Sequence, residues 1–216
     1  RKILPEVTKP VVTYGIDFEA DYNAELLRQE EAKTWFKVSR KDKKDWLEVE
    51  LNLPGKHNLL NALASIAVAH ELGVSDDDII NALCHFQGIS RRCHVHGHIK
   101  INGHTVTFID DYAHHPSEIE ATFAAIRAGW PDRRLIVIYQ PHRYTRMRDL
   151  FEDFSHVLSQ TEVLLILDVY AAGEEVIAGA DSRSLCRAIR LRGQVDPVFI
   201  EDKEEVMGVL SGLIED

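Results

Sequence analysis

Apolar and polar residues alternate through the first quarter of the chain, and this period of two is typical of half-buried β-strands. In residues 46–52, three aliphatic side chains alternate with two glutamates. The segments 11–15, 24–30 and 34–39 have the same strand-like character. The stretch between the last two strands, residues 40–45, is charged and has no apolar side chain to bury. We therefore predict an antiparallel meander.

The apolar positions take helical spacing after residue 55. Residues 57–72 are apolar over more than half of the helical circumference, which predicts a mostly buried helix. Gly73 is expected to end this helix, and Ser75 is expected to cap a second helix over residues 76–85.

A domain boundary is expected at about residue 92, because the helical pattern breaks at Gly88 and strand alternation resumes at His94. The predicted domains are residues 1–92 and 93–216. In the second domain, four predicted strands are each followed by a predicted helix. The strands are 106–110, 135–139, 163–167 and 198–200, and the helices are 116–128, 146–158, 182–191 and 203–213. The two middle strands are continuous apolar runs, so we predict a doubly wound α/β domain with a mainly parallel sheet.

The composition excludes several classes of protein. The 216 residues include 25 Lys and Arg against 35 Asp and Glu, which gives a formal net charge of −10. A nucleic-acid-binding protein needs a basic surface, so we exclude that class and expect a few placed cations or a metal ion to bind any phosphate. No apolar run approaches the roughly 20 residues of a membrane span, so we expect no membrane insertion.

The cysteines indicate the cellular location of the protein, and the first residues indicate whether the chain is complete. The three cysteines are odd in number and lack a CxxC pair, which indicates reduced thiols and a cytoplasmic location. The segment Arg1–Pro5 has neither a signal-peptide pattern nor an initiator methionine, so we expect either a fragment of a longer protein or a processed product.

Candidate chemistry gathers in three loops that follow predicted strands, namely residues 110–116, 140–146 and 168–174. Ligands of doubly wound sheets bind beyond the carboxyl ends of the strands. Each loop mixes His or Tyr with charged side chains. A polar residue at one strand end is common, but three such loops in succession predict a binding or active site.

The first loop permits two interpretations. Asp110 and Asp111 point to opposite faces of their strand, so at least one should reach the crevice, where a ribose hydroxyl or a metal suits a carboxylate. The structural alternative is a helix start in which Pro116 occupies the first helical position and His115 is the cap.

The second loop and the first long helix offer further candidates. Arg143 and Arg146, three residues apart at a helix entrance, suit a bidentate grip on a carboxylate; the alternative is a Thr145 cap beside a solvated Arg143. Asn58 and Asn61 lie on one helix face. Asn58 suits a cap, whereas the amide of Asn61 inside an apolar helix needs partners, which a ligand or the protein could supply.

The run of histidines at 94–98 raises the hypothesis of a metal site. Alternate residues share a strand face, but no carboxylate or thiolate follows at a diagnostic spacing, so a solvated strand face is favoured. The sequence contains no nucleophile elbow and no dinucleotide fingerprint. It also contains no phosphate loop, since Lys56 is followed by His57 instead of Ser or Thr. The residues by themselves indicate a nucleotide- or acid-binding α/β domain, part of another domain, and no complete catalytic machinery.

Six segments that extend over essentially the whole chain resemble the Mur ligases, a family of ATP-dependent amide ligases. They are PGKHNLLNALA at 54–64, FQGISRR at 86–92, DDYAHHPSEI at 110–119, QPHRYTR at 140–146, DVYAAGE at 168–174 and GADSRSLC at 179–186. The resemblance implies that residues 1–92 are the α+β tail of a central P-loop-type ATP-binding domain. Residues 93–216 are then most of a Rossmann-like C-terminal domain. The family's sugar-binding domain, phosphate loop, magnesium-binding residues and last strand have no counterpart in this sequence.

The resemblance also implies a reaction. UDP-N-acetylmuramate and L-alanine are the implied substrates, joined with ATP and Mg²⁺ through an acyl phosphate in peptidoglycan precursor synthesis. The magnesium ligands are expected mostly outside this chain, and no metal ligand is assigned within it. The truncated chain alone is expected to be inactive, and its oligomeric state stays open.

The family's functional residues map onto matching positions. His57, Asn58 and Asn61 are implied to contact the nucleotide, Arg92 the phosphates and Asp111 the ribose, with ATP between the two domains. Arg92 and His114 are the implied catalytic residues. The implied contacts for L-alanine and the muramyl group are Tyr112, His114, His142, Arg143 and Arg146.

Three alternatives remain. Within the family, a ligase that attaches a murein tripeptide to the same UDP-sugar shares a segment like that at 110–116, although the HRYTR stretch favours the L-alanine enzyme. The isolated chain could instead be a non-catalytic nucleotide- or substrate-binding module. A metal hydrolase that uses some of the 11 histidines is the third alternative.

Overall fold

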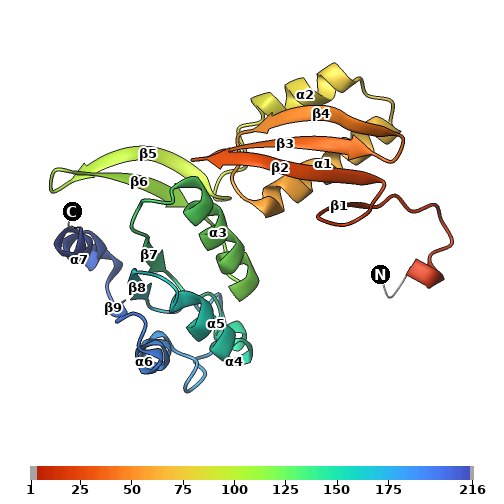
Figure 1. Cartoon of the computed structure of the whole chain (residues 1–216). Helices are drawn as coiled ribbons and strands as arrows, with labels where there is room; N and C mark the ends of the chain where they lie inside the picture. Colours follow the sequence, from red (N-terminus) through yellow and green to blue (C-terminus); the bar gives the residue numbers. More distant parts are fainter. Residues whose placement is uncertain (1–3, 215–216) are drawn as a thin grey trace. The chain divides into compact units, whose positions relative to one another are not determined.

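The computed structural model describes residues 4–214, which form two compact units. The first unit contains the chain up to Ser90 together with Ala124–Pro131, and the second contains Arg91–Phe123 and the chain from Asp132 onward. Figure 1 labels the helices and strands in chain order. Part of the N-terminal segment considered above, residues 1–3, lies outside the described residues.

The first unit contains a four-stranded sheet in the order β1-β2-β3-β4. Its strands are β1 (Tyr14–Ile16), β2 (Tyr22–Glu30), β3 (Lys33–Arg40) and β4 (Lys43–Leu51), preceded by a short 3-10 helix, η1 (Leu4–Glu6). Strands β2, β3 and β4 pair antiparallel, as the meander requires, whereas β1 pairs parallel to β2. The turn between β3 and β4 is shorter than predicted, because the ladder closes on the pair Arg40 and Lys43.

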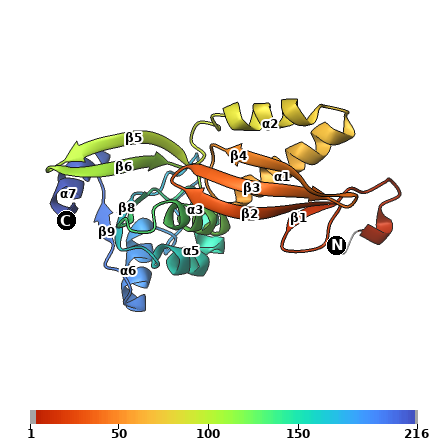
Figure 2. The ribbon, with the colours of Figure 1, turned by 45° about the horizontal axis from the view of Figure 1, so that its top comes forward.

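Two helices, α1 (Lys56–Glu71) and α2 (Asp76–His85), pack against this sheet, with α2 beside β4 (Figure 2). The prediction that the first helix is mostly buried is wrong. One side of α1 buries Leu59, Leu63 and Ile66 in the core, while the side chain of Val68 is 60% exposed. The sheet covers only one side of the helix, so apolar residues on the other side stay in contact with solvent.

Local signals set the ends of these helices as predicted. Gly73 follows α1 with a φ of +77°, a left-handed conformation that glycine adopts readily, and its N–H donates to the carbonyl of His70. The Ser75 hydroxyl accepts a hydrogen bond from the N–H of Asp78, which caps α2.

The second unit contains a three-stranded parallel sheet in the order β7-β8-β9 and a separate antiparallel pair, β5-β6. The strands are β5 (His94–Ile101), β6 (His104–Asp110), β7 (Ile136–Tyr139), β8 (Val163–Leu167) and β9 (Val198–Ile200). The segment 106–110 is a strand, but its expected place in the parallel sheet is not observed among residues 4–214. Asn102 and Gly103 both have positive φ, 53° and 88°, and form the tight turn of a hairpin that pairs β6 with β5.

Helices cover both faces of the parallel sheet, which confirms the predicted doubly wound α/β class. One face packs against α3 (Pro116–Gly129), α4 (Tyr144–Asp149), α5 (Phe151–Leu158) and α6 (Ser182–Arg192). The other face packs against α7 (Val206–Leu213), which a 3-10 turn, η2 (Lys203–Glu205), precedes. The single helix predicted over 146–158 is divided at Leu150, whose backbone leaves the helical region with φ −122° and ψ 24°. Within residues 4–214, no helix has both the length and the apolar character required to cross a bilayer.

Candidate active site

Three loops of the second unit bring four aromatic rings into one cluster. The ring centroids of Tyr112 and His114 are 5.0 Å apart, and those of His114 and His142 are 6.0 Å apart. Tyr170 extends the series, with its ring 5.2 Å from that of His142. The first two residues follow β6, the third follows β7 and the fourth follows β8. The structure thus brings together three of the predicted substrate-contacting residues and adds Tyr170, which lies in the third predicted loop but was not singled out.

Backbone hydrogen bonds hold the second and third loops together. The N–H of Arg143 donates to the carbonyl of Tyr170 at 2.9 Å, and the N–H of Tyr170 donates to the carbonyl of Pro141 at 2.8 Å. Arg143 precedes α4 in a left-handed conformation with a φ of +72°. This backbone conformation costs conformational free energy in a non-glycine residue, and residues strained in this way are common at functional sites. The two loops therefore act as one rigid edge of the site.

Arginine side chains lie beside the aromatic cluster. The Arg146 guanidinium is 3.3 Å from both Nδ1 and the carbonyl oxygen of His142. Partial burial of His142, together with the positive charges of Arg146, His114 and Arg143, lowers the pKa of its imidazole. A ring held in its neutral form beside a guanidinium can accept or donate a hydrogen bond without adding charge.

Glu174 holds the start of α4, and sequence reasoning did not single it out. Its carboxylate accepts the N–H of Thr145 at 3.0 Å and the hydroxyl of Thr145 at 2.7 Å. Arg143 lies 4.0 Å from the same carboxylate. These hydrogen bonds, with the nearby guanidinium, hold the pKa of Glu174 below its usual range. Thr145 is therefore fixed by an acidic side chain of the third loop, and the alternative in which Thr145 caps the helix is not observed.

The carboxylate of Asp111 is engaged locally. One oxygen accepts the N–H of Cys93 at 2.8 Å and the other accepts the N–H of Ala113 at 2.7 Å. Its neighbour Asp110 lies 3.9 Å from the ring of His96. The geometry gives Asp111 a structural role in shaping the loop, and its implied contact with a ribose stays a prediction.

The start of α3 joins two further predicted residues. Glu118 accepts hydrogen bonds from the N–H groups of His114 and His115 at 3.0 and 3.1 Å, and it lies 3.8 Å from the Arg92 guanidinium. The ring of His115 accepts from the N–H of Ser117 at 3.3 Å, so the helix-start interpretation of this loop is confirmed. Glu118 was missed, although a glutamate three residues after the helix cap is a recognised start signal.

The implied nucleotide contacts of the first unit gather at the beginning of α1. Asn58 donates from its amide to the carbonyl of Pro54 at 2.8 Å, which is a structural role close to the predicted cap. Half-buried His57 precedes it in the first turn. The burial argument for Asn61 is wrong, because its side chain is exposed on the solvent side of the helix and water can satisfy its amide. The ligand contacts of all three stay predictions.

The histidine strand does not form a recognisable metal centre. The rings of His94 and His96 are 4.6 Å apart. A β-bulge interrupts the ladder between Val95 and Gly97, so the expected alternation of faces is broken at His96. Among residues 4–214, no group of three His, Cys, Asp or Glu side chains is arranged to hold a metal ion. The described residues therefore do not fit a magnesium site.

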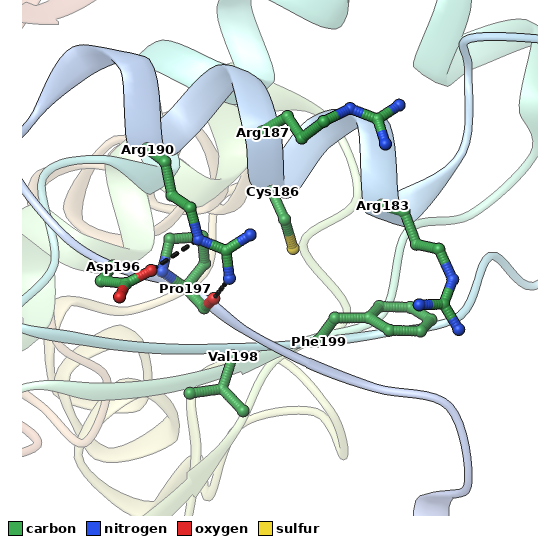
Figure 3. Close-up of a pocket in the computed structure, with 8 residues that line it drawn as sticks. All are labelled: Arg183, Cys186, Arg187, Arg190, Asp196, Pro197, Val198 and Phe199. Atoms are coloured by element: carbon green, nitrogen blue, oxygen red, sulfur yellow. Dashed lines mark hydrogen bonds and ion pairs between the residues drawn. The ribbon is translucent and has the colours of Figure 1, made fainter.

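A cavity of about 510 Å³ lies between α6 and β9, and it contains none of the predicted site residues (Figure 3). Its guanidinium groups have partners within the same region. Arg190 pairs with Asp196 at 2.6 Å, and Arg183 pairs with Glu201 at 2.8 Å and stacks on the Phe199 ring. Because exposed carboxylates already neutralise two arginines, we interpret this cavity as a salt-bridged surface groove.

Comparison with known proteins places these features in a family. Residues 91–216 match the Mur ligase glutamate ligase domain, and residues 1–69 match the Mur ligase middle domain. UDP-N-acetylmuramate-alanine ligase MurC from Thermotoga maritima is similar, with a TM-score of 0.74 and 27% identity, over 95% of this chain and 42% of that one.

Two less similar structures share the fold. A murein peptide ligase from Psychrobacter arcticus 273-4 has a TM-score of 0.56 and 23% identity, over 93% of this chain and 40% of that one. Folylpolyglutamate synthase from Thermotoga maritima has a TM-score of 0.62 and 17% identity, over 89% of this chain and 42% of that one. The chain thus spans less than half the length of the structures it resembles. The match to the glutamate ligase domain alone extends over more than half of the chain, and on that evidence the chain belongs to the Mur ligase family.

Proposed function

We propose that this chain is part of a cytoplasmic ligase that joins L-alanine to the carboxylate of UDP-N-acetylmuramate in peptidoglycan precursor synthesis, using ATP. The observation that carries the proposal is the cluster of Tyr112, His114, His142 and Arg146 at the loops following β6 and β7. The similarity to the Thermotoga maritima alanine ligase over 95% of this chain supports the choice of substrates.

The proposed chemistry proceeds in two steps. The muramyl carboxylate attacks the γ-phosphorus of ATP, which gives an acyl phosphate and releases ADP. The amine of L-alanine then attacks the acyl carbon, a proton leaves the nitrogen and inorganic phosphate departs. Because a carboxylate must approach a triphosphate, the protein has to position the reactants and neutralise negative charge. Bound Mg²⁺ would supply part of that neutralisation, with ligands from other parts of the ligase.

The residues of the second unit suit the second step. Arg143 and Arg146 offer fixed donors for the carboxylate of L-alanine, and Arg92 offers a positive charge to the phosphates. His142, held neutral, and Tyr112 give hydrogen-bonding partners near the muramyl group. For the nucleotide, we propose contacts from the α1 residues and from Asp111, namely His57, Asn58, Asn61 and the Asp111 carboxylate.

The test compares amino-acid substrates in the complete ligase that contains this chain. With UDP-N-acetylmuramate, ATP and L-alanine, we expect rapid amide formation in a single turnover, as measured by mass spectrometry. Faster turnover with a murein tripeptide than with L-alanine would replace this proposal with the tripeptide ligase. Formation of no amide with either substrate would exclude both.

A second candidate applies to the chain by itself. The sequence contains no phosphate-loop motif, which favours a non-catalytic binding role for this polypeptide when isolated. We expect the purified chain to hydrolyse no ATP above background and to bind nucleotide weakly. ATP turnover by the purified chain would contradict this expectation.

A further inference from the structure

Glu118 lies in the first turn of α3, beside both residues that the family resemblance implies are catalytic, His114 and Arg92. Its Oε2 atom accepts the backbone N–H of His114 at 3.0 Å and lies 3.7 Å from the Nδ1 atom of the same residue. Its Oε1 atom lies 3.8 Å from the Arg92 guanidinium. We propose that Glu118 is a positioning residue that fixes the His114 ring and the Arg92 guanidinium relative to each other. The catalytic consequence rests on the ligase function proposed above.

The hydrogen bonds around His114 define which ring nitrogen is available for chemistry. Nδ1 lies 2.8 Å from the carbonyl oxygen of Tyr112, and a carbonyl oxygen can only accept. Nδ1 therefore carries the hydrogen, and in the neutral ring Nε2 is the atom with a free lone pair. With the backbone N–H and Nδ1 of His114 both near Glu118, the ring has little freedom to rotate away.

Glu118 is a carboxylate beside a group of aromatic and cationic side chains. His142 neighbours the ring of His114, and Arg146 and Arg143 lie close to His142 on the second loop. The Glu118 carboxylate lies 3.7 Å from Nδ1 of His114 and 3.8 Å from the Arg92 guanidinium, so it can hold the position of both side chains.

Glu118 itself is held in its ionised form. Partial burial would raise the pKa of its carboxyl, but the N–H donors of His114 and His115 and the charges of His114 and Arg92 more than offset that effect. The pKa of Glu118 therefore lies below its usual range. Because the carboxylate persists at neutral pH, it remains a constant anchor between the Arg92 guanidinium and the His114 loop.

A capping role alone does not account for this geometry. Oε2 is sufficient to accept the two N–H groups at the start of the helix, as in a capping box. Oε1 faces Arg92, which precedes β5 and is not part of the helix. The second oxygen thus ties a side chain from another segment to the His114 loop, which is the arrangement expected of a residue that orients a site.

The first experiment measures the orientation of the His114 ring by NMR in this chain, in E118Q and in E120Q. Glutamine keeps an oxygen that can accept the N–H groups, so E118Q removes the charge while retaining the cap. Glu120 is exposed on the same helix and provides a matched loss of charge. We expect the His114 ring to lose its fixed position beside Tyr112 in E118Q, seen as weaker nuclear Overhauser effects between the two rings, which lie 5.0 Å apart, and to keep it in E120Q. Unchanged contacts in E118Q, or an equal loss in E120Q, would overturn the proposal.

The second experiment uses the complete ligase and separates positioning from folding. We expect E118Q to lower kcat roughly tenfold or more and to displace the pH profile of kcat, while its Tm and the activity of E120Q stay close to those of the parent. Unchanged kcat and an unchanged pH profile in E118Q would exclude the positioning role. If the parent enzyme forms no amide, the proposed function fails, while the NMR result still decides whether Glu118 controls His114.

Discussion

The phenol oxygen of Tyr22 lies 2.7 Å from Nδ1 of His70, so a single hydroxyl group joins strand β2 to the last turn of α1. The same oxygen lies 3.0 Å from Oε1 of Glu71, and the Arg40 guanidinium contacts Nε2 of the His70 ring. Since Arg40 can only donate, Nε2 accepts and Nδ1 donates to Tyr22, whose hydroxyl then donates to Glu71. These hydrogen bonds connect α1 to the sheet against which it packs.

The Tyr22→Phe variant tests that connection. Loss of the hydroxyl leaves Nδ1 of half-buried His70 without its acceptor and removes the hydrogen bond to exposed Glu71, so we expect the free energy of unfolding to fall by about 1 kcal/mol. Burial and the hydrogen bond to Glu71 raise the pKa of Tyr22 to about 12. The stability from this phenol is therefore complete below pH 10 and is lost as the pH rises from 10 toward 12. Urea unfolding measured by tryptophan fluorescence should show a steeper alkaline loss of stability in the parent chain than in Y22F; parallel curves would contradict this account.

The Arg146→Gln variant tests the electrostatics of the aromatic cluster. Burial is the main cause of the lowered pKa of His142, and the Arg146 charge is the next. Removal of that charge should raise the pKa of His142 part of the way toward its ordinary value. Because the folded state resists protonation of His142, stability falls as the pH drops below about 6.5, and R146Q should reduce that loss.

Histidine NMR titration and acid unfolding together check this prediction. The matched control is Arg148→Gln, since Arg148 is an exposed residue of α4 that pairs with Asp149. A His142 titration that is the same in R146Q and in the parent chain would show that burial alone sets its protonation.

Much of the fold could be predicted because periodicity depends on local sequence. Strands β8 and β9 and helix α2 have the predicted bounds, since each is a short apolar or amphipathic run between clear start and stop signals. The pairing of β6 could not be deduced from its own alternation, because alternation specifies a strand and leaves its neighbour open. The Asn102-Gly103 turn was the available signal, and it favours the hairpin that is observed.

The site could be predicted in part for a related reason. The strand-end rule explains why His142 and Tyr170 lie together, because the parallel strands β7 and β8 end on one side of their sheet. Tyr112 and His114 also lie beside His142, but they follow β6, which is outside that sheet, so the rule does not account for their position. Glu174 was missed because its importance comes from the backbone N–H and hydroxyl of Thr145, which no sequence pattern displays. Glu118 was missed although its place three residues after the helix cap is a start signal. Asn61 was misjudged because an apolar helix sequence does not reveal which side the sheet covers.

Separate alanine substitutions at Asn58 and Asn61 distinguish stability from ligand binding. Asn58 donates to the carbonyl of Pro54, so N58A should lose about 1 kcal/mol of folding stability. Exposed Asn61 should tolerate alanine with a change within about 0.5 kcal/mol. If Asn61 contacts the nucleotide, N61A in the complete ligase should raise the KM for ATP roughly tenfold, the effect of one lost hydrogen bond. An unchanged KM in N61A would remove Asn61 from the proposed nucleotide site.

Alanine substitutions at Arg92 and Asp111 test the remaining nucleotide contacts in the complete ligase. Arg92 is half exposed and its ion pair with Glu118 is long, so R92A should fold normally and raise the KM for ATP roughly tenfold. Asp111 accepts two backbone N–H groups, so D111A should raise the KM for ATP and also lower folding stability by roughly 1–2 kcal/mol. Arg187→Ala on α6 is the control, because it removes a cation from the groove beside β9 and should leave ATP kinetics unchanged. If R92A and R187A raise the KM for ATP equally, the effect follows from net charge, and Arg92 has no specific contact with the phosphates.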